Sequence, residues 1–295
     1  MSGKILVTGG NGYIGRNLVR FLLENDHFVD TLDVNEKSIT NATNYFNCNI
    51  NRLEELKKIK NEYDLIIHCA GSPSVPMSVE NPQKDFSINL EATLNMLQFS
   101  RQNNSTFIFL STVSVFDTKN KLPLIESSER KPTSPYGASK LASEAYCQAY
   151  FRSYGLDTRI ARIFNTYGPE MKHLFISDMI KKINLSKDDV VIGGSGNQIR
   201  DYIFIEDLVQ AIYVIYQNGL PGEDYNICSG KLITLKDITE KMLKIMNKEN
   251  LSIKCDGKNY DGDIEKWYGD PSKINSIGFE QNFNIEEGLK KTLIK

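Results

Sequence analysis

Tyr136 and Lys140 are the two residues whose types and spacing most clearly suggest acid–base chemistry. They lie four positions apart, at the start of a predicted helix over residues 139–154, so that both side chains can share one helix face. A phenol has an ordinary pKa of about 10, which is too high for efficient proton exchange at neutral pH. Because a neighbouring ammonium stabilises the phenolate, the pair predicts that Tyr136 can act as an acid and a base.

Thr112 is the third candidate for this chemistry. It follows a predicted strand over residues 106–111, and ligands bind at the carboxyl edge of the strands in open α/β sheets. We therefore expect its hydroxyl to orient the same reacting oxygen as Tyr136. A tyrosine and a lysine at this spacing also fit an exposed helix start, so the interpretation depends on the motifs that accompany them.

A glycine-rich turn, residues 8–15, lies between the predicted strand Lys4–Thr8 and a helix that begins near Ile14. Its glycines match both GxGxxG and GxxGxxG, which allow a tight turn whose helix-start amides hold a pyrophosphate. A second predicted strand, Phe28–Asp33, ends about twenty residues further on in Asp33, where a carboxylate accepts hydrogen bonds from both hydroxyls of an adenosine ribose. A dinucleotide site is predicted, and repulsion of a 2′-phosphate favours NAD over NADP. A strand-to-helix turn without a ligand is the alternative.

The elements that must position these residues alternate between short apolar runs and helical patterns. Strands are predicted at Lys4–Thr8, Phe28–Asp33, 64–69, 106–111 and 158–164. This alternation predicts an α/β fold with a doubly wound, Rossmann-type parallel sheet. The later segments are shorter and predict a smaller α/β domain. We assign residues 1–166 to dinucleotide binding and 167–295 to substrate binding, and we expect part of residues 200–230 to return to the first domain.

Composition excludes several broad classes of protein. The 295 residues are 40% hydrophobic and 24% charged, as in ordinary globular proteins. A net charge of −2 gives no overall attraction to nucleic acid or to an anionic membrane, and no apolar run reaches the ~18 residues of a membrane span. Three histidines without an HExxH or Cys/His cluster predict no metal site. Five scattered cysteines without a CxxC pair indicate reduced thiols and a cytoplasmic location.

Short motifs occur in a fixed order along nearly the whole chain, at residues 8–15, 68–71, 74–76, 81–82, 89, 112, 134–140, 162–169, 200–202 and 269–273. In this order they resemble the extended short-chain dehydrogenase/reductase superfamily, in its NAD-dependent epimerase/dehydratase branch. Members of that branch act on nucleotide-diphosphate sugars. The resemblance also implies a homodimer, formed through helices around residues 85–100 and 139–154; the apolar residues there that support it are Leu94, Leu97, Ala145 and Ala149.

The resemblance assigns roles by position. It implies that Tyr136 exchanges the proton, that Lys140 holds the nicotinamide ribose and lowers the tyrosine pKa, and that Thr112 hydrogen-bonds the reacting sugar oxygen. Implied cofactor contacts, besides Tyr136 and Lys140, are Gly9, Gly12, Tyr13, Ile14, Gly15, Asp33, Asn49, Ile50, Ala70, Gly71 and Phe164. Implied substrate contacts are Ser74, Thr112, Asn165, Arg200 and Trp267.

Two of the substrate contacts have open alternatives. The Arg200 guanidinium presents paired donors to phosphate oxygens, but an ion pair with Asp201 or Glu206 would use it differently. Trp267 aligns with a position that gates the sugar pocket in some 4-epimerases, and a core tryptophan that anchors the C-terminal segment explains it equally well.

The chain departs from the family pattern at three places. One is Tyr260, which replaces an arginine that often contacts the second phosphate, with Lys258 as a substitute. Dehydratases of this branch usually carry Asp-Glu directly after the threonine, where this chain has Val113 and Ser114, which disfavours a 4,6-dehydratase. Where the family usually has Gly-Asp after the third strand, this chain has Cys48 and Asn49. Asn49 can still form one hydrogen bond to an adenine, so the expected change in cofactor binding is small.

Three functions follow from these residues. The first is a nucleotide-diphosphate-hexose 4-epimerase that works by transient oxidation at C4 and return of the hydride. The second is a 4-reductase of nucleotide-diphosphate 4-keto-6-deoxy sugars that uses the same three side chains. A non-catalytic dinucleotide-binding sensor is the third, and the retention of both Tyr136 and Lys140 argues against it. The sequence does not specify the nucleotide, the sugar or the pathway.

Overall fold

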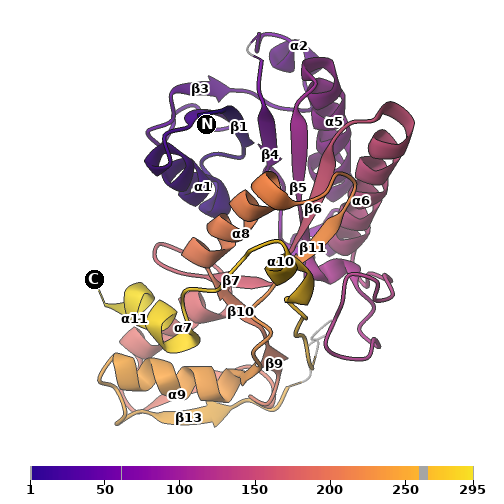
Figure 1. Cartoon of the computed structure of the whole chain (residues 1–295). Coiled ribbons are helices and arrows are strands. Elements are labelled where there is room, and N and C mark those ends of the chain that lie inside the picture. Colours follow the sequence, from indigo (N-terminus) through magenta and orange to yellow (C-terminus); the bar gives the residue numbers. More distant parts are fainter. Residues whose placement is uncertain (1, 61, 259–264, 295) are drawn as a thin grey trace.

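Seven parallel strands form the central sheet of the computed structural model, which describes residues 2–60, 62–258 and 265–294. Tyr260 lies outside the residues that the structure describes. Their order is β11-β6-β5-β4-β1-β2-β3 (Figure 1). The strands are β1 (Lys4–Thr8), β2 (Phe28–Asp33), β3 (Asn44–Asn47), β4 (Leu65–His68), β5 (Thr106–Thr112), β6 (Thr158–Ile163) and β11 (Asp224–Ile227). The order reverses between β1 and β4, which creates the crevice where doubly wound sheets bind ligands. The predicted Rossmann-type sheet is thereby confirmed.

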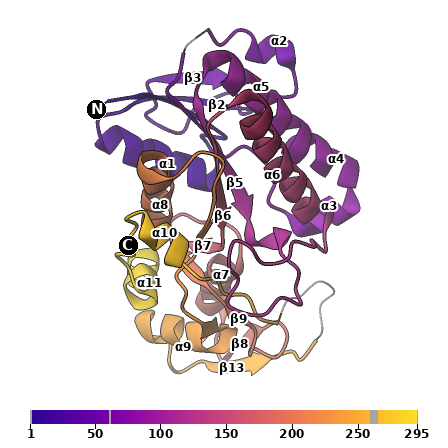
Figure 2. The ribbon, with the colours of Figure 1, turned by 45° about the vertical axis from the view of Figure 1, so that its right-hand side comes forward.

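Helices cover both faces of this sheet, because successive side chains of a strand point to opposite sides. Ile5 and Val7 of β1 belong to one buried cluster, on the side of α1 (Tyr13–Glu24) and α8 (Ile205–Asn218). Leu6 belongs to the other, with α5 (Ala92–Asn103) and α6 (Pro135–Tyr154). Figures 1 and 2 show α1 with α8 on one face and α5 with α6 on the other. Burial on both faces explains the continuous apolar runs of the strands.

The helix predicted over residues 139–154 begins earlier, at Pro135. The Ser134 hydroxyl caps it by accepting a hydrogen bond from the Gly137 amide at 3.1 Å, and proline is favoured at the first helical position because its missing N–H would have no intrahelical partner there. The cap at Ser134 therefore determines where the helix begins, although the apolar pattern starts only later in the sequence. As a result, Tyr136 lies inside the first turn of α6.

The helical stretch expected over residues 85–99 is divided in the structure. It consists of α4 (Pro82–Phe86), a π-helical turn (Ser87–Glu91) and α5. The Asn81 side chain caps α4 through the Lys84 amide at 3.0 Å. The short helices α2 (Leu53–Leu56) and α3 (Val75–Glu80) precede it. Figure 2 shows α3 and α4 beside α6, so the π-helical turn lies against the helix that carries Tyr136.

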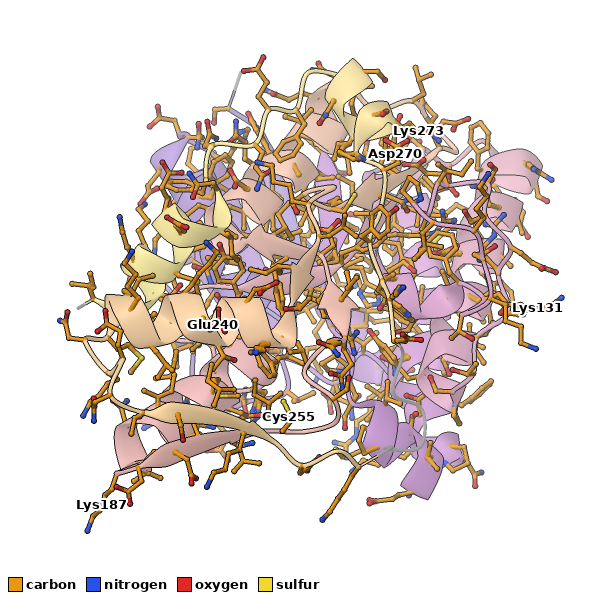
Figure 3. The ribbon with its side chains drawn as sticks, turned by 90° about the horizontal axis from the view of Figure 1, so that it is seen from below. Lys131, Lys187, Glu240, Cys255, Asp270 and Lys273 are labelled. Carbon is orange, nitrogen blue, oxygen red and sulfur yellow. The ribbon has the colours of Figure 1, made fainter. Side chains whose placement is uncertain are left out.

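In its described residues, the C-terminal part contains three two-stranded ribbons and, besides α8 and a helix that packs on β11, three helices (Figure 1). The ribbons pair β7 (Asn165–Tyr167) with β10 (Tyr202–Phe204), β9 (Ile199–Arg200) with β12 (Ile233–Thr234), and β8 (Asp189–Ile192) with β13 (Ser252–Cys255). The helices are α7 (Phe175–Leu185), α9 (Leu235–Ile245) and α11 (Ile285–Leu293). In Figure 3, Glu240 marks α9 where it covers the ribbon that contains Cys255.

The chain returns from this part to the central sheet. After α8, strand β11 pairs with β6 and becomes the edge of the sheet. Helix α10 (Ser272–Ser276) packs on β11, and the Lys273 ammonium contacts Glu223 at 2.7 Å and Asp224 at 3.1 Å. Figure 3 shows Lys273 close to Asp270 at this helix. No helix in the described part of the chain is both long and apolar enough to cross a bilayer.

Candidate active site

The turn between β1 and α1 is a cradle that only glycine can form. Gly9 has a φ of +66°, and a Cβ atom there would lie 2.8 Å from the Ala70 backbone. A Cβ atom on Gly15 would lie 2.2 Å from the Gly9 carbonyl oxygen. The Gly12 amide donates to that same oxygen at 2.9 Å. No described side chain caps α1, so the amides of its first turn can hold a pyrophosphate.

Asp33 lies at the carboxyl end of β2, next to the cradle, and is 9% exposed. Its carboxylate accepts hydrogen bonds from the Asn11 amide at 3.0 Å and from the Asn35 side chain at 2.9 Å. These contacts hold an acceptor where the adenosine ribose of a dinucleotide would lie. Asn49 follows β3, and its side-chain oxygen accepts from the Asn51 amide at 3.1 Å. Ile50 is buried in the core.

The opposite wall of the crevice follows β4. The Ala70 amide donates to the Thr8 hydroxyl at 3.1 Å, and this hydroxyl contacts His68 Nδ1 at 2.8 Å. Burial, assisted by the charge of Lys140, lowers the pKa of His68 to about 3, so its ring is neutral. A Cβ atom on Gly71 would lie 2.8 Å from the side-chain oxygen of Asn89. The ends of β1 and β4 are thus tied together across the switch point.

Tyr13 and Ile14 begin α1 and point their side chains away from the turn. The Tyr13 ring lies 5.3 Å from the Arg16 guanidinium, and burial raises the pKa of its phenol. Ile14 packs against the core. Both residues therefore contribute to the cradle through their backbone. The glycines, the open amides and Asp33 together fit a dinucleotide.

Thr112 and Tyr136 are brought together at the carboxyl edge of the sheet. Thr112 ends β5, and its hydroxyl donates to the Ser114 hydroxyl at 3.3 Å and lies near enough to Tyr136 to act on the pKa of the phenol. Burial raises the pKa of Tyr136 to about 12; the Thr112 hydroxyl opposes this, and the charge of Asp85 adds to it. For the protein's own groups burial outweighs the stabilising contact, and the lowered pKa expected beside Lys140 and a bound nicotinamide stays a prediction.

Lys140 lies on the same helix, 7% exposed, with its nitrogen 4.3 Å from the centre of the Phe109 ring. Burial lowers the pKa of Lys140 to about 8, against the opposing effects of Cys69, Cys147, Glu144 and Asp85. The ammonium is therefore still the main form at neutral pH, but it is held in an apolar environment.

Comparison with known proteins identifies the family of this chain. Residues 5–228 match the NAD dependent epimerase/dehydratase family. The chain belongs to this family. As an epimerase/dehydratase family member, it is an enzyme whose fold carries a nucleotide cofactor, and the family resemblance read from the motif order is confirmed.

Individual relatives cover almost the whole length of this family member. A putative UDP-glucose 4-epimerase of Methanocaldococcus jannaschii is 31% identical, over 98% of this chain and 97% of its own. The structure of a UDP-N-acetylglucosamine 4-epimerase from Methanobrevibacter ruminantium, in complex with UDP-N-acetylmuramic acid, is 28% identical. It covers 99% of this chain and 97% of its own, with a TM-score of 0.91. A Thermotoga maritima UDP-glucose 4-epimerase structure with UDP-glucose is 27% identical, covers 98% and 97%, and has a TM-score of 0.89.

A predicted cofactor residue and a predicted substrate residue of this epimerase/dehydratase family member lie in one apolar cluster beside Thr112. Phe164 and Trp267 are buried there; the other buried members are Val113, Val115, Phe116, Leu124 and Cys228. The Trp267 amide donates to the Ile199 carbonyl at 3.1 Å, which places the tryptophan next to the strand that carries Arg200. Trp267 is 8% exposed and belongs to the same cluster as Val113, the residue that follows Thr112.

Asp201 and Glu206, the two acidic residues considered as ion-pair partners of Arg200, form other contacts. The Asp201 carboxylate accepts from the amides of Ser229 at 2.8 Å, Gly230 at 2.9 Å and Gly269 at 3.2 Å. Glu206 forms an ion pair with Lys291 at 2.8 Å. Both carboxylates are therefore engaged with groups other than the Arg200 guanidinium in these contacts.

The remaining predicted substrate residues have local partners. Asn165 donates from its side chain to the Asp201 carbonyl at 3.0 Å. The Ser74 hydroxyl caps α3 by accepting from the Met77 amide at 3.3 Å.

Sequence reasoning missed a set of buried polar residues behind the tyrosine and lysine. Glu144 accepts from Ser111 at 2.6 Å and from the fully buried Arg162 at 2.8 Å through each of its oxygens. Asp85 accepts from Ser139 at 2.6 Å. The available signal was spacing, because Glu144 follows Lys140 by one helical turn and Asp85 precedes Asn89 by another.

Proposed function

We propose that this chain is a nucleotide-diphosphate-hexose 4-epimerase that uses NAD. The observation that carries the proposal is that Thr112, Tyr136 and Lys140 lie together, buried, at the edge of a sheet whose glycine cradle is flanked by Asp33. The relatives named as 4-epimerases support the same reaction. The acidic Asp33 supports NAD, because a 2′-phosphate beside it would be repelled.

In this proposal, the side chains handle the proton of the sugar. Thr112 holds the 4-oxygen, and Tyr136 removes the hydroxyl proton as C4 becomes a carbonyl carbon. When bound, NAD supplies reversible acceptance of the C4 hydride and a positive charge near the phenol. Lys140 adds a second positive charge and binds the ribose. After the 4-keto sugar has rotated in the site and C4 has regained the hydride on its other face, Tyr136 returns the proton to the 4-oxygen, so no atom is gained or lost.

The positions after Thr112 argue against a dehydratase, although the family includes dehydratases. Val113 is apolar and 6% exposed, within the cluster that holds Phe164. Ser114 donates its amide to the Thr112 hydroxyl at 3.2 Å. Neither residue carries a carboxylate, and removal of water from a sugar needs a separate acid and base.

One observation favours a second candidate, the 4-reductase of a 4-keto-6-deoxy sugar. Burial raises the pKa of Tyr136 to about 12, so the phenol is protonated at neutral pH and suited to donate a proton to a carbonyl oxygen. The reductase would consume one reduced cofactor in each turnover, whereas the epimerase would consume none. Cofactor consumption therefore separates the two candidates.

The test is to identify the cofactor bound to the purified protein and then to follow UDP-, GDP-, CDP- and dTDP-hexoses by NMR. We expect C4 epimers to interconvert without added NADH, and Tyr136→Phe to keep the cofactor but lose turnover. Tyr146→Phe is the matched control, because Tyr146 lies on the same helix and is 43% exposed. Strict consumption of NADH or NADPH in each turnover would refute the epimerase and support the reductase.

For the sugar nucleotide, we propose that Arg200 meets the diphosphate and that Trp267 flanks the sugar. Support comes from their adjacency, since Ile199 accepts the Trp267 amide and precedes Arg200. Arg200→Lys should weaken substrate binding, measured as KM, more than it lowers kcat, because lysine lacks the paired donors. An unchanged KM would contradict this role.

We also propose a homodimer through α5 and α6. Ala145 and Ala149 are exposed on α6, and Leu94 on α5 is half-buried, which supports a helical contact there. Leu97 points into the core instead and cannot take part. Sedimentation of the purified protein should give the mass of two chains, and a monomer would refute the proposal.

A further inference from the structure

Asp85 is a buried carboxylate behind the tyrosine and lysine, with no role yet in the reaction. It lies in α4 and is 4% exposed. One of its oxygens accepts from the Ser139 hydroxyl at 2.6 Å, and the other accepts from the Asn89 side chain at 2.7 Å. Ser139 lies directly before Lys140 and three residues after Tyr136 on α6. Asp85 therefore binds the turn of helix that separates these two residues.

The contacts of Asp85 extend to the wall of the cofactor crevice. Asn89 lies in the π-helical turn, and its side-chain oxygen accepts from the Ser72 amide at 3.0 Å. Its backbone carbonyl accepts from the Ser143 hydroxyl at 3.2 Å. The Asp85 carboxylate, Asn89 and these serines thus connect the segment after β4 with the start of α6. A change at Asp85 would move both walls relative to each other.

The charge of Asp85 needs a compensating charge. Burying a carboxylate is costly unless hydrogen bonds and an opposite charge offset the lost hydration. Within the described residues, Asp85 forms no direct ion pair, and its two side-chain donors, Ser139 and Asn89, are neutral. Lys140, buried and with no direct ion pair within the same residues, interacts electrostatically with Asp85. The two buried charges balance each other across Ser139.

We propose that Asp85 is a positioning residue of this site: its carboxylate fixes the start of α6 against the π-helical turn and places a negative charge beside Tyr136 and Lys140. The inference rests on the proposed function, because it assigns Asp85 a task only if these two residues act on a substrate. Its charge opposes the tyrosinate and favours the ammonium, so Asp85 adds to the effect of burial on Tyr136 and partly offsets the effect of burial on Lys140.

Other groups also face the two residues and enter the pH dependence. Tyr136 faces Asp85 from α4 and the Thr112 hydroxyl from β5. Lys140 faces groups from the end of β4, from α6 and from α4, namely His68, Cys69, Glu144, Cys147 and Asp85. Among the groups that face Tyr136, Asp85 is the carboxylate, so its replacement should have a distinct effect on the phenol.

The test compares Asp85→Asn with Ser139→Ala and with Glu80→Gln in NAD-loaded protein. Asp85→Asn removes the charge and keeps the size of the side chain, with its oxygen toward Asn89 and its amide group able to donate to the Ser139 hydroxyl, whereas Ser139→Ala keeps the charge and removes the hydrogen bond to α6. Glu80 is an exposed carboxylate at the end of the neighbouring α3 and controls for a general charge effect. The readouts are kcat against pH and the titration of Tyr136, followed by NMR of ring-labelled tyrosine and assigned by Tyr136→Phe.

We expect Asp85→Asn to shift the Tyr136 titration to lower pH. Because Lys140, whose pKa is about 8, also loses a charge that favours its ammonium, the ratio of kcat at pH 6 to kcat at pH 8 should rise about three-fold. Ser139→Ala should lower kcat about ten-fold through lost alignment, with an unchanged ratio. Glu80→Gln should change neither. An unmoved titration in Asp85→Asn, or an equal shift in Glu80→Gln, would overturn the inference.

Two further results keep the test decisive. If Asp85→Asn does not fold, Ser139→Ala still tests the inference. A reduced kcat with an unchanged pH ratio would support the proposal that the hydrogen bond aligns α6 while the charge sets the pH dependence. A shifted pH ratio in Ser139→Ala would refute that proposal. If the wild-type protein turns over no nucleotide sugar, the proposed function fails. The NMR titration needs no substrate, so the effect of Asp85 on Tyr136 is still measured separately.

Discussion

Replacing Lys140 with methionine should stabilise the folded chain at neutral pH and abolish the proposed activity. The lysine is 7% exposed, and burial lowers its pKa from the ordinary 10.5 to about 8. Because the unfolded chain binds this proton more tightly than the folded chain, the charged lysine lowers the free energy of unfolding. This penalty is present in full below pH 8 and is relieved between pH 8 and 10.5. At about 1.4 kcal/mol per pKa unit, the penalty is about 3 kcal/mol at pH 7 and about 1 kcal/mol at pH 10.

Methionine removes this penalty while its flexible apolar side chain still packs on Phe109. With an unfolding entropy of about 0.6 kcal/mol/K for a chain of this size, the melting temperature at pH 7 should rise by about 5 °C. The assay is denaturant unfolding of both proteins at pH 7 and pH 10, at equal cofactor content. Lys187→Met is the control, because Lys187 is exposed (Figure 3). A loss of stability at pH 7, or a gain that does not shrink by pH 10, would refute the reasoning.

Three further changes test other parts of the site. Gly15→Ala should abolish cofactor retention, because its Cβ would lie 2.2 Å from the Gly9 carbonyl oxygen; the released nucleotide is quantified after denaturation. Glu144→Gln should lower the free energy of unfolding by about 3 kcal/mol, because it leaves the buried Arg162 guanidinium with less compensating charge; urea titration measures this. Asp33→Asn should raise the affinity for NADP relative to NAD by about ten-fold, because the repelling charge is gone; calorimetric titration of both cofactors checks the ratio.

Exposed acidic residues supply the controls for these changes. Glu54 is 83% exposed and pairs with Lys57 at 2.8 Å, so Glu54→Gln should change stability by less than about 0.5 kcal/mol. Asp178→Asn, on the surface of α7, should leave the cofactor preference unchanged. Full cofactor retention in Gly15→Ala would show that the turn relaxes. An Asp33→Asn protein with unaltered preference would assign NAD selectivity to other groups.

The sheet was predictable because its strands carry strong local signals. Residues 4–8 and 28–33 are apolar runs that end at a glycine turn and at an acid, and the structure places both strands as expected. The interruption of the helix between Pro82 and Asn103 was not predictable, because apolar spacing does not distinguish a π-helical turn from continuous α-helix. The division depends on tertiary contacts, such as that of Asn89 with Ser72.

In the site, motif spacing predicted Tyr136 and Thr112 but not the pKa of the phenol. Proximity to a cation is read from spacing, whereas burial depends on everything that packs around the ring. The same limit applies to Asp85 and Glu144, because sequence patterns treat a charged residue on a helix as exposed. Both carboxylates are buried and hydrogen-bonded in the folded chain.

Strand β11 comes late in the chain but completes the central sheet, so the enzyme is hard to divide into two fragments. A fragment that stops at residue 166 would lack this strand and would leave the backbone of β6 as an open, apolar sheet edge, which favours aggregation. Lys273 of α10, which comes still later in the chain, also forms an ion pair with Asp224 of β11. Substrate preference therefore cannot be transplanted between relatives by exchanging one contiguous block. A working chimera would have to exchange the segments on either side of α8 and β11 together while keeping those two elements with the sheet that they complete.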